Sequence, residues 1–323
     1  MRKKYYPTHR KHTNVMYSSV MMLRFQDLIG SHMTQSVRAI LICLVAYLCF
    51  DLMSIHVRYL SARYSAQELS VYRNIFGILP SIVLLWYTRE LSMRPADYKL
   101  VRWKLALSRG FVVAIAQLMF YTALSQLELA TVSALAQTNA LFVVLLAILM
   151  FREQVGFWRW GAVIIGFIGA VWIVRPGTDV FSWIALLPIG AAFCYAFAVV
   201  SLRSFDRSIS NSILYLYSAF SAAIGAIFFA LFTNSFSPIL SIIDAALILS
   251  MSICGGFGVI FLMIAYRQAD ATVLAPFSYF GILTAFFFGW VLFGEFPVDK
   301  LFPGVILIIG SGLVILWREH RAK

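Results

Sequence analysis

Long apolar runs, separated by short polar connections, follow one another along almost the whole chain. A helix needs about 20 mostly apolar residues to cross the hydrocarbon core of a bilayer. Ten runs meet this requirement, and we expect each of them to be a membrane-spanning helix. The runs are residues 39–58, 69–88, 106–126, 130–151, 157–174, 183–202, 211–232, 245–266, 271–294 and 301–317.

The composition indicates that lipid is the solvent of most of this chain. Of its 323 residues, 61% are hydrophobic and 12% are charged, whereas a soluble domain has about 45–50% apolar and about 25% charged residues. Too few polar side chains are present to cover the apolar surface in water. We therefore predict an all-α polytopic membrane protein, with only residues 1–37 and the tail 319–323 outside the bundle.

The basic residues are distributed unevenly between the two sides of the membrane. With both termini inside, 20 of the 26 Lys and Arg residues fall on the inner side and 4 on the outer side. Cytoplasmic segments carry such an excess, so we expect cytoplasmic N- and C-termini. This bias also explains the net charge of +12 without a nucleic-acid partner. Residues 1–37 are predicted to be a basic extension, either lying on the inner leaflet or dispensable, with Met33 as the start.

The second half of the chain repeats the first. The sequence "ATVSALAQTNALF" at 130–142 matches "ATVLAPFSYFGIL" at 271–283, and further on Glu153 falls on Glu295. Upstream of these segments, a constant offset of 145 aligns Arg58 with Arg203. These matches keep the same order along both halves, which supports an internal duplication.

Each repeat, residues 38–176 and residues 182–318, contains five of the predicted spans. Because five is odd, the second repeat has to enter the membrane from the opposite side. Two inverted repeats are typical of secondary carriers, in which the substrate binds near the midplane between the halves. We therefore predict ten transmembrane helices as two inverted five-helix repeats.

Three charged side chains, Asp51, Arg73 and Arg109, fall within the predicted spans. A charge at the bilayer centre costs about 2.5–3.5 kcal/mol, so such groups are expected to face a cavity or one another. Asp51 is central, and we expect it to pair with an arginine across helices, either as a structural clamp or as a substrate contact. For Arg109, snorkelling to the cytoplasmic surface is an equally good interpretation.

Uncharged polar side chains extend this set, because each polar group in lipid needs a partner and a shared water-filled cavity provides one. Hydrogen bonding between helices is the alternative interpretation. Pro80, Pro188 and Pro276 interrupt the second, sixth and ninth spans, as static kinks or as hinges. The predicted substrate-binding residues are Asp51, Arg73, Arg109, Gln117, Tyr121, Gln137, Asn139, Tyr195, Tyr217, Ser278 and Tyr279.

The sequence contains no recognisable catalytic, metal or cofactor motif. All four cysteines lie in apolar runs without ligand-type spacing, so we expect free thiols. A phosphate-binding loop with Lys-Ser/Thr and the hydrolase and metallopeptidase motifs are also missing. We therefore predict a carrier without a cofactor, whose partners are a small-molecule substrate and the bilayer. A membrane-embedded enzyme and a purely structural membrane subunit are the alternatives.

Several motifs resemble those of a known family. "FREQVGFWRWGAVIIGFIGAVWIVRPG" and "FGEFPVDKLFPGVILIIGSGLVILWRE" resemble the paired signatures of the EamA-type branch of the drug/metabolite transporter superfamily. "YRNIFGILP" and "LSRGF" are similar to the arginine motifs of its second and third spans. The resemblance covers residues 39–318. It implies ten helices around a central cavity and gradient-driven transport of a small organic solute across a bacterial inner membrane.

The same resemblance bears on the substrate. The stretch "DATVLAPFSYF", together with Asp51, is more similar to members that move S-adenosylmethionine or riboflavin than to typical amino-acid exporters. We therefore expect a heterocyclic vitamin or a nucleoside-like metabolite, with a proton or another ion as the coupling partner; an amino-acid or drug exporter of the same fold is the alternative. Ala140 stands where this branch often has proline, so no proline hinge is predicted there.

Overall fold

The computed structural model describes residues 35–87, 100, 102–152, 156–175, 182–205, 211–269 and 274–321. Residues 1–34 of the predicted N-terminal extension and residues 322–323 of the tail lie outside this part. The elements are α2 (Gln35–Leu60), α3 (Ala66–Phe76), α4 (Leu79–Tyr87), α5 (Trp103–Gln126), α6 (Leu129–Ala136), α7 (Asn139–Phe151), α8 (Phe157–Val174), η2 (Trp183–Leu186), α9 (Leu187–Val200), η3 (Ser201–Ser204), α10 (Asn211–Phe232), α11 (Ile242–Gln268), η4 (Ala275–Tyr279), α13 (Phe280–Phe293), α14 (Val298–Leu301) and α15 (Gly304–Arg321).

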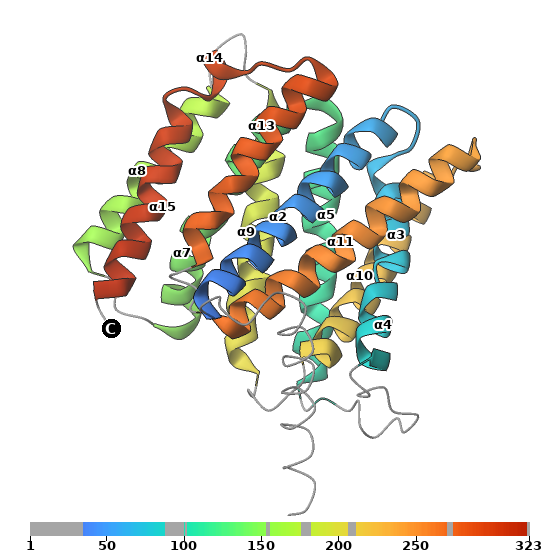
Figure 1. Ribbon diagram of the computed structural model, residues 1–323, viewed down its shortest axis with the longest axis horizontal. Coiled ribbons are helices and arrows are strands. Elements are labelled where there is room, and N and C mark those ends of the chain that lie inside the picture. The colour runs from blue at the N-terminus through green and yellow to red at the C-terminus, as the bar shows by residue number, and fades with distance from the viewer. Residues whose placement is uncertain are drawn as a thin grey trace, which may run out of the picture.

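The described helices form an all-α, multi-pass membrane fold. Six segments are long and apolar enough to cross a bilayer: 37–60, 103–126, 129–151, 183–200, 213–232 and 242–266. Shorter apolar helices cover Trp160–Val174, Phe277–Phe293 and Gly304–Val314. Large apolar side chains such as Trp86 and Phe157 are exposed, as expected where lipid is the solvent. α2 begins and α15 ends at the same face of the bundle (Figure 1); we call the opposite face the far face.

Breaks in the helices occur at the three prolines that the sequence marks. α3 ends at Phe76 and α4 begins at Leu79, directly before Pro80. Pro188 lies in the first turn of α9, where η2 changes into an α-helix, and Pro276 lies in η4 before α13. Proline lacks the N–H that continues a helix and clashes with the preceding turn. The predicted interruptions are therefore confirmed.

A fourth break occurs without a proline. α6 ends at Ala136 and α7 begins at Asn139, so that Gln137 and Thr138 form a turn within an apolar segment. The hydroxyl of Thr138 donates to the carbonyl of Leu135 at 2.7 Å, which satisfies one of the carbonyls that the break leaves without a helical partner. Polar side chains on the turn thus replace the proline.

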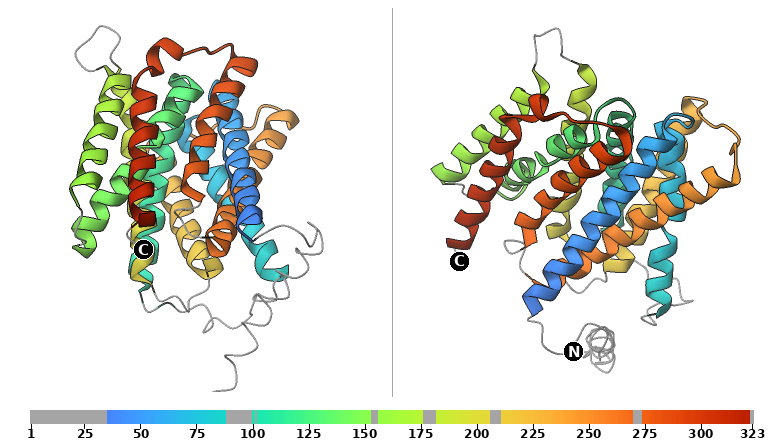
Figure 2. Two further views of the ribbon diagram at one scale, coloured as in Figure 1. Left: turned by 60° about the vertical axis from the view of Figure 1, so that its left-hand side comes forward. Right: turned by 45° about the horizontal axis from the view of Figure 1, so that its top comes forward.

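Contacts between the two halves of the chain hold the bundle together. α2 packs most extensively against α11, α5 packs against both α9 and α10, and α3 packs against α10. α8 and α15 form a further pair, and the two views of Figure 2 place them side by side at one edge of the bundle. Each of these pairs joins a helix of the first half to a helix of the second.

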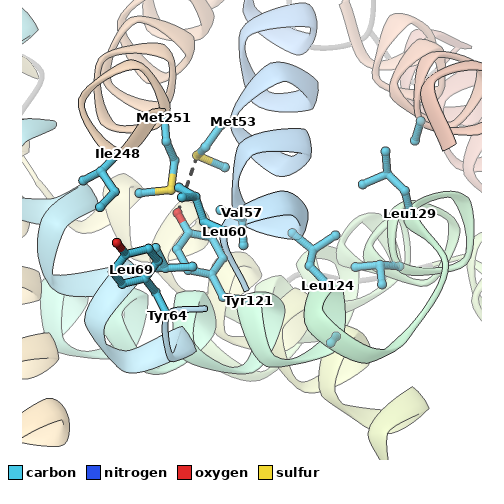
Figure 3. Close-up of a cluster of buried hydrophobic side chains, with 13 residues drawn as sticks. Met53, Val57, Leu60, Tyr64, Leu69, Tyr121, Leu124, Leu129, Ile248 and Met251 are labelled. Atoms are coloured by element: carbon cyan, nitrogen blue, oxygen red, sulfur yellow. Dashed lines mark hydrogen bonds between the residues drawn. The ribbon is translucent and has the colours of Figure 1, made fainter. Parts of the chain in front are cut away.

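The first of the apolar clusters fills the bundle toward the far face. It is formed by the ends of α2 and α5 and the beginnings of α3, α6 and α11 (Figure 3). Its members include Met53, Val57, Leu60, Tyr64, Leu69, Tyr121, Leu124, Leu129, Ile248 and Met251. Because all of these side chains are less than 9% exposed, the cluster closes the interior of the bundle on this side.

Replacing Gly169 with alanine is expected to lower the melting temperature of the protein in detergent. A Cβ atom at Gly169 would lie 2.7 Å from the carbonyl oxygen of Gly304 and 2.8 Å from the Cβ of Leu307, where α8 crosses α15. Such overpacking costs about 1–3 kcal/mol. Gly161 on the same helix is the matched control, because nothing lies within 4 Å of a Cβ there. Alanine at position 161 should leave the melting temperature unchanged or raise it slightly. Equal melting of the two variants would contradict a close α8–α15 contact at Gly169.

Candidate functional site

A cluster of polar side chains surrounds Arg73, in the last turn of α3. The guanidinium Nη1 donates to Asn74 Oδ1 at 3.3 Å, and Nη2 lies 3.5 Å from the carbonyl oxygen of Gly255 on α11. Nε has no hydrogen-bond partner among the described residues. The phenol groups of three tyrosines lie around the guanidinium: Tyr121 of α5, Tyr195 of α9 and Tyr215 of α10. Helices of both halves therefore meet at this arginine.

Two amides adjoin this cluster. Asn74 Nδ2 donates to Gln117 Oε1 at 2.6 Å, and the hydroxyl of Ser70 donates to the same oxygen at 3.3 Å. All three side chains are buried. These bonds fix the Gln117 side chain between α3 and α5, and Asn74 then presents its Oδ1 to Arg73.

Asp51 lies on another side of α2 and bonds to α13. Its Oδ2 accepts a short hydrogen bond from the hydroxyl of Thr284, and the aspartate is buried. The ion pair that we expected between Asp51 and an arginine is not found among the described side chains, so this prediction was wrong there. The physical reason is the helical register, since Asp51 faces α13, whereas Met53, two residues further on, faces Tyr121.

Further predicted residues meet where the interrupted segments approach each other. Gln137 Nε2, at the α6–α7 break, donates to the carbonyl of Ser278 in η4 at 2.9 Å. The hydroxyl of Ser278 in turn donates to Gln137 Oε1 at 3.4 Å, and the Tyr47 hydroxyl of α2 lies nearby. Asn139 Nδ2, at the beginning of α7, donates to the carbonyl of Ala192 on α9 at 2.9 Å. Both breaks therefore place polar groups inside the bundle.

Three predicted residues have other surroundings. Arg109 is buried, and it donates through Nε to the carbonyl of Ala198 at 2.9 Å and through Nη1 to the hydroxyl of Ser218 at 3.0 Å. It thus joins α9 to α10 and does not snorkel to the surface. Tyr217 packs with a cluster at the beginnings of α5 and α10. Tyr279 packs against Ile308, with its hydroxyl next to Gly312 of α15.

Comparison with known proteins identifies the class of protein to which this site belongs. Residues 37–175 match the EamA-like transporter family. This match covers the first of the two proposed repeats. An S-adenosylmethionine uptake transporter of Rickettsia felis is 24% identical, over 87% of this chain and 92% of that protein. A riboflavin transporter of Vibrio cholerae is 26% identical, over 87% of this chain and 93% of that protein. A riboflavin transporter of Rhizobium johnstonii is 31% identical, over 59% of this chain and 62% of that protein.

A solved structure shares the fold. It is 18% identical, has a TM-score of 0.62, and matches 88% of this chain and 98% of that protein. These curated relatives are named as transporters and not as enzymes. The chain is therefore a multi-pass membrane protein similar to EamA-like transporters, and this similarity implies a small-molecule substrate.

The far face of the bundle carries a set of ion pairs, which we call the far-face network. Arg58 Nη2 at the end of α2 bonds Glu295 Oε1 at 2.9 Å, and Glu295 Oε2 accepts from the backbone N–H of Leu129 at 2.8 Å. Lys300 of α14 forms a close pair with Glu128, before α6. Arg63 and Asp244 form a third pair at 3.0 Å. Each of these pairs joins the first half of the chain to the second.

One carboxylate of this network lies outside the membrane spans and is clearly perturbed. Burial by itself raises the pKa of Glu128, but the hydrogen bonds and charge of Lys300 outweigh it, so that the pKa lies below its usual value. Glu128 therefore stays ionised in its pair with Lys300 at neutral pH.

Several residues of the site were not predicted from the sequence: Tyr47, Ser70, Asn74, Tyr215 and Thr284. Asn74 carried a usable signal, because it directly follows Arg73 within a predicted span. The other four are single hydroxyl groups in apolar helices. Nothing in the sequence distinguishes them from hydroxyl groups that bond only to their own helix.

Proposed function

We propose that this transporter is a secondary carrier built as two inverted five-span repeats, residues 38–176 and 182–318. It moves a small organic metabolite across the bacterial inner membrane by alternating access. The favoured substrates are a heterocyclic vitamin such as riboflavin or a nucleoside-like compound such as S-adenosylmethionine. The observation that carries the proposal is the buried polar cluster at Arg73, to which both halves contribute side chains. A substrate site between the repeats is the arrangement found in secondary carriers.

The packing of the helices supports the inverted repeat. In the proposed duplication α2 corresponds to η2–α9, α3–α4 to α10, α5 to α11, α6–α7 to η4–α13, and α8 to α14–α15. When each helix is replaced by its counterpart in the other half, the contact between α2 and α11 becomes the contact between α9 and α5, and the structure contains both contacts. It leaves the pairs α3–α10, α6–α13 and α8–α15 in place, as expected for elements on a two-fold axis.

Contacts between individual residues show the same correspondence between the two halves. Gln137 and Ser278 stand at equivalent positions after the matching Ala-Thr-Val segments, and they bond to each other. The offset of 145 relates Gly110 to Gly255 and Arg73 to Ser218. In the structure Gly110 abuts Ser218, while Gly255 abuts Arg73. These matched contacts favour a pseudo-two-fold axis in the membrane plane.

The orientation follows from charge. With α2 beginning and α15 ending in the cytoplasm, 20 of the 26 Lys and Arg residues lie inside. The far face is then the outer one. The apolar cluster of Figure 3 and the far-face network both close that side, so the structure supports a state closed to the outside.

In this proposal the predicted residues have different roles. Arg73, Gln117, Tyr121 and Tyr195 contact the substrate, and tyrosine rings suit a flat heterocycle. Gln137, Asn139 and Ser278 supply hydrogen bonds at the helix breaks. Arg109, Tyr217 and Tyr279 position the helices that surround the cavity. Asp51 carries the coupling proton, because a buried carboxyl group can bind and release one during the cycle.

A ligand screen tests the proposal. Purified protein in detergent is melted with riboflavin, S-adenosylmethionine, nucleosides, amino acids and cationic drugs. A ligand at 100 times its Kd stabilises the folded state by about 2.7 kcal/mol, which shifts the melting temperature measurably. We expect a shift with a heterocyclic or nucleoside-like compound, followed by saturable uptake of that compound into proteoliposomes.

The alternatives give different results in the same assays. Shifts with amino acids or cationic drugs alone would favour an exporter of the same fold. Conversion of a ligand to a new product would indicate a membrane-embedded enzyme. No saturable binding by well-folded protein would favour a structural subunit and would overturn the proposed carrier.

A further inference from the structure

The guanidinium of Arg73 is a buried cation that has no anionic partner within the part of the chain that the structure describes. The side chain is 7% exposed. Among the side chains that the structure describes, no carboxylate contacts it, and the groups that accept from it are neutral, including Asn74 Oδ1 at 3.3 Å and the carbonyl of Gly255 at 3.5 Å. Arginine cannot give up its charge in a protein. An uncompensated buried charge of this kind costs several kcal/mol.

The neighbouring phenols are also hydrogen-bond donors with weak acceptors. The hydroxyl of Tyr121 donates to the thioether of Met53 at 3.6 Å, and Figure 3 shows it directed at this sulfur. The hydroxyl of Tyr215 donates to the carbonyl of Gly77 at 3.3 Å, near the upper limit for such a bond. Together with Arg73 Nε, which has no acceptor, the cluster contains at least three donors that lack a good acceptor.

A purely structural role leaves this excess of donors unexplained. Arg73 lies in the last turn of α3, where the helix dipole favours a cation. That term stabilises the charge but accepts no hydrogen bond from Nε. Arg109 shows what a structural arginine of this bundle looks like, with acceptors at 2.9 and 3.0 Å on two neighbouring helices.

One edge of the guanidinium faces Gly255 of α11. Nε and Nη2 form the edge that binds a carboxylate with two parallel hydrogen bonds. Gly255 lies opposite this edge, and a Cβ there would stand 3.1 Å from Nε and 2.8 Å from Met53 Sδ. Glycine therefore keeps the position free of a side chain, and the flexible thioether of Met53 can rotate aside.

We propose that Arg73 binds a carboxylate group of the transported molecule, with Tyr121 and Tyr215 donating to the same group. This inference rests on the proposed carrier function and narrows its substrate class. The substrate is an organic anion or zwitterion with a carboxylate attached to a heterocyclic body. A compound of the S-adenosylmethionine type is then favoured over an uncharged vitamin such as riboflavin.

Matched ligand pairs test the inference by isothermal titration calorimetry on the full chain in detergent. S-adenosylmethionine is compared with its decarboxylated form, and riboflavin with flavin mononucleotide. Because a charged, bidentate hydrogen bond forms only with the carboxylate, we expect S-adenosylmethionine to bind about 10- to 100-fold more tightly than its decarboxylated form. In Arg73→Gln this preference should disappear, with affinity for the decarboxylated form unchanged.

A second variant keeps the test decisive if Arg73→Gln fails to fold. Tyr215→Phe removes one donor and leaves the charge, so the carboxylate preference should fall about threefold to tenfold. Tyr59→Phe is the control, because the Tyr59 side chain of α2 is 50% exposed and lies outside the cluster at Arg73, and it should keep the full preference.

Five outcomes would overturn the inference. Equal binding of the two S-adenosylmethionine forms excludes a carboxylate site, and a preference that survives Arg73→Gln assigns it to other residues. Tighter binding of flavin mononucleotide than of riboflavin, without a difference between the two S-adenosylmethionine forms, would place a phosphate at Arg73 instead. Saturable riboflavin uptake that is unaffected by Arg73→Gln would leave the carrier function standing and remove only this inference. Failure of all four ligands to bind would remove both the proposed substrate class and the inference.

Discussion

Replacing Glu295 with alanine is expected to destabilise the protein by about 2–4 kcal/mol, because it breaks a largely buried ion pair from one side. The side chains of Glu295 and Arg58 are only 10% and 22% exposed. The substitution leaves the guanidinium of Arg58 with the carbonyl of Leu124 as its remaining acceptor and takes the acceptor from the Leu129 N–H at the beginning of α6. Both of the lost interactions lie at the contact between the two halves of the chain.

Thermal unfolding in detergent, followed by tryptophan fluorescence, measures this effect. A loss of this size corresponds to a drop of roughly 5–15 °C for a chain of this length. Asp299→Asn is the matched control on the same face, since Arg175 donates to the backbone carbonyl of Asp299 and not to its carboxylate. Lys300→Gln is expected to have a melting temperature between those of Glu295→Ala and Asp299→Asn. Its pair with Glu128 is 51% exposed on the lysine side, and such exposed pairs contribute about 0–1 kcal/mol.

The same substitution should slow transport. A carrier has to close its outer side once per cycle, and each 1.4 kcal/mol lost from that closed state lowers its population relative to the open state tenfold. We therefore expect uptake by proteoliposomes to fall by about tenfold or more in Glu295→Ala and to stay unchanged in Asp299→Asn. Equal melting temperatures and equal uptake for the two variants would show that the far-face network does not hold the halves together.

Much of the architecture could be predicted from the sequence, because it depends on local physical chemistry. Apolar runs of sufficient length, the prolines and the charge asymmetry predicted the membrane fold, the helix breaks and the expected orientation. The break between α6 and α7 was harder to predict, since Ala140 stands where a proline would have marked it. Its polar turn at Gln137 and Thr138 was visible in the sequence only as a group of candidate site residues.

The partners of the site residues could not be predicted, because they depend on which face each helix turns inward. Tyr215 and Tyr217 are two residues apart, and a helix places such neighbours about 200° apart. The sequence favoured Tyr217, but the structure places Tyr215 at Arg73 and Tyr217 in another cluster. α10 is apolar on most sides, so its periodicity does not reveal the inward face.

The partner of Asp51 shows the same limit. Electrostatics favoured an arginine, yet the rotation of α2 directs this carboxyl group to α13 and away from the Arg73 cluster. The consequence is a functional separation within one helix. Met53 belongs to the surroundings of the proposed carboxylate-binding arginine, while Asp51 stands apart with a hydroxyl as its partner.

Replacing Asp51 with asparagine is therefore expected to abolish concentrative uptake while leaving the fold intact. Asp51 is 6% exposed, and its Oδ2 accepts from Thr284. The Thr284 hydroxyl also lies 3.0 Å from the carbonyl of Phe280, and an asparagine oxygen can accept from it as the carboxylate does. The substitution thus keeps the hydrogen bond and removes the ability to bind and release a proton.

Two transport assays and one stability assay separate the possible roles of Asp51. If it carries the coupling proton, Asp51→Asn should lower uptake driven by a proton gradient by at least about tenfold, but should still exchange labelled for unlabelled substrate across the membrane. Thr284→Val is the control for a structural clamp, since it removes the hydrogen bond and keeps the carboxyl group, at a cost of about 1 kcal/mol. Similar losses of melting temperature in both variants, with gradient-driven uptake per folded molecule unchanged, would assign Asp51 to the clamp. Retained exchange with lost gradient-driven uptake, in Asp51→Asn alone, requires that the proton moves through this carboxyl group.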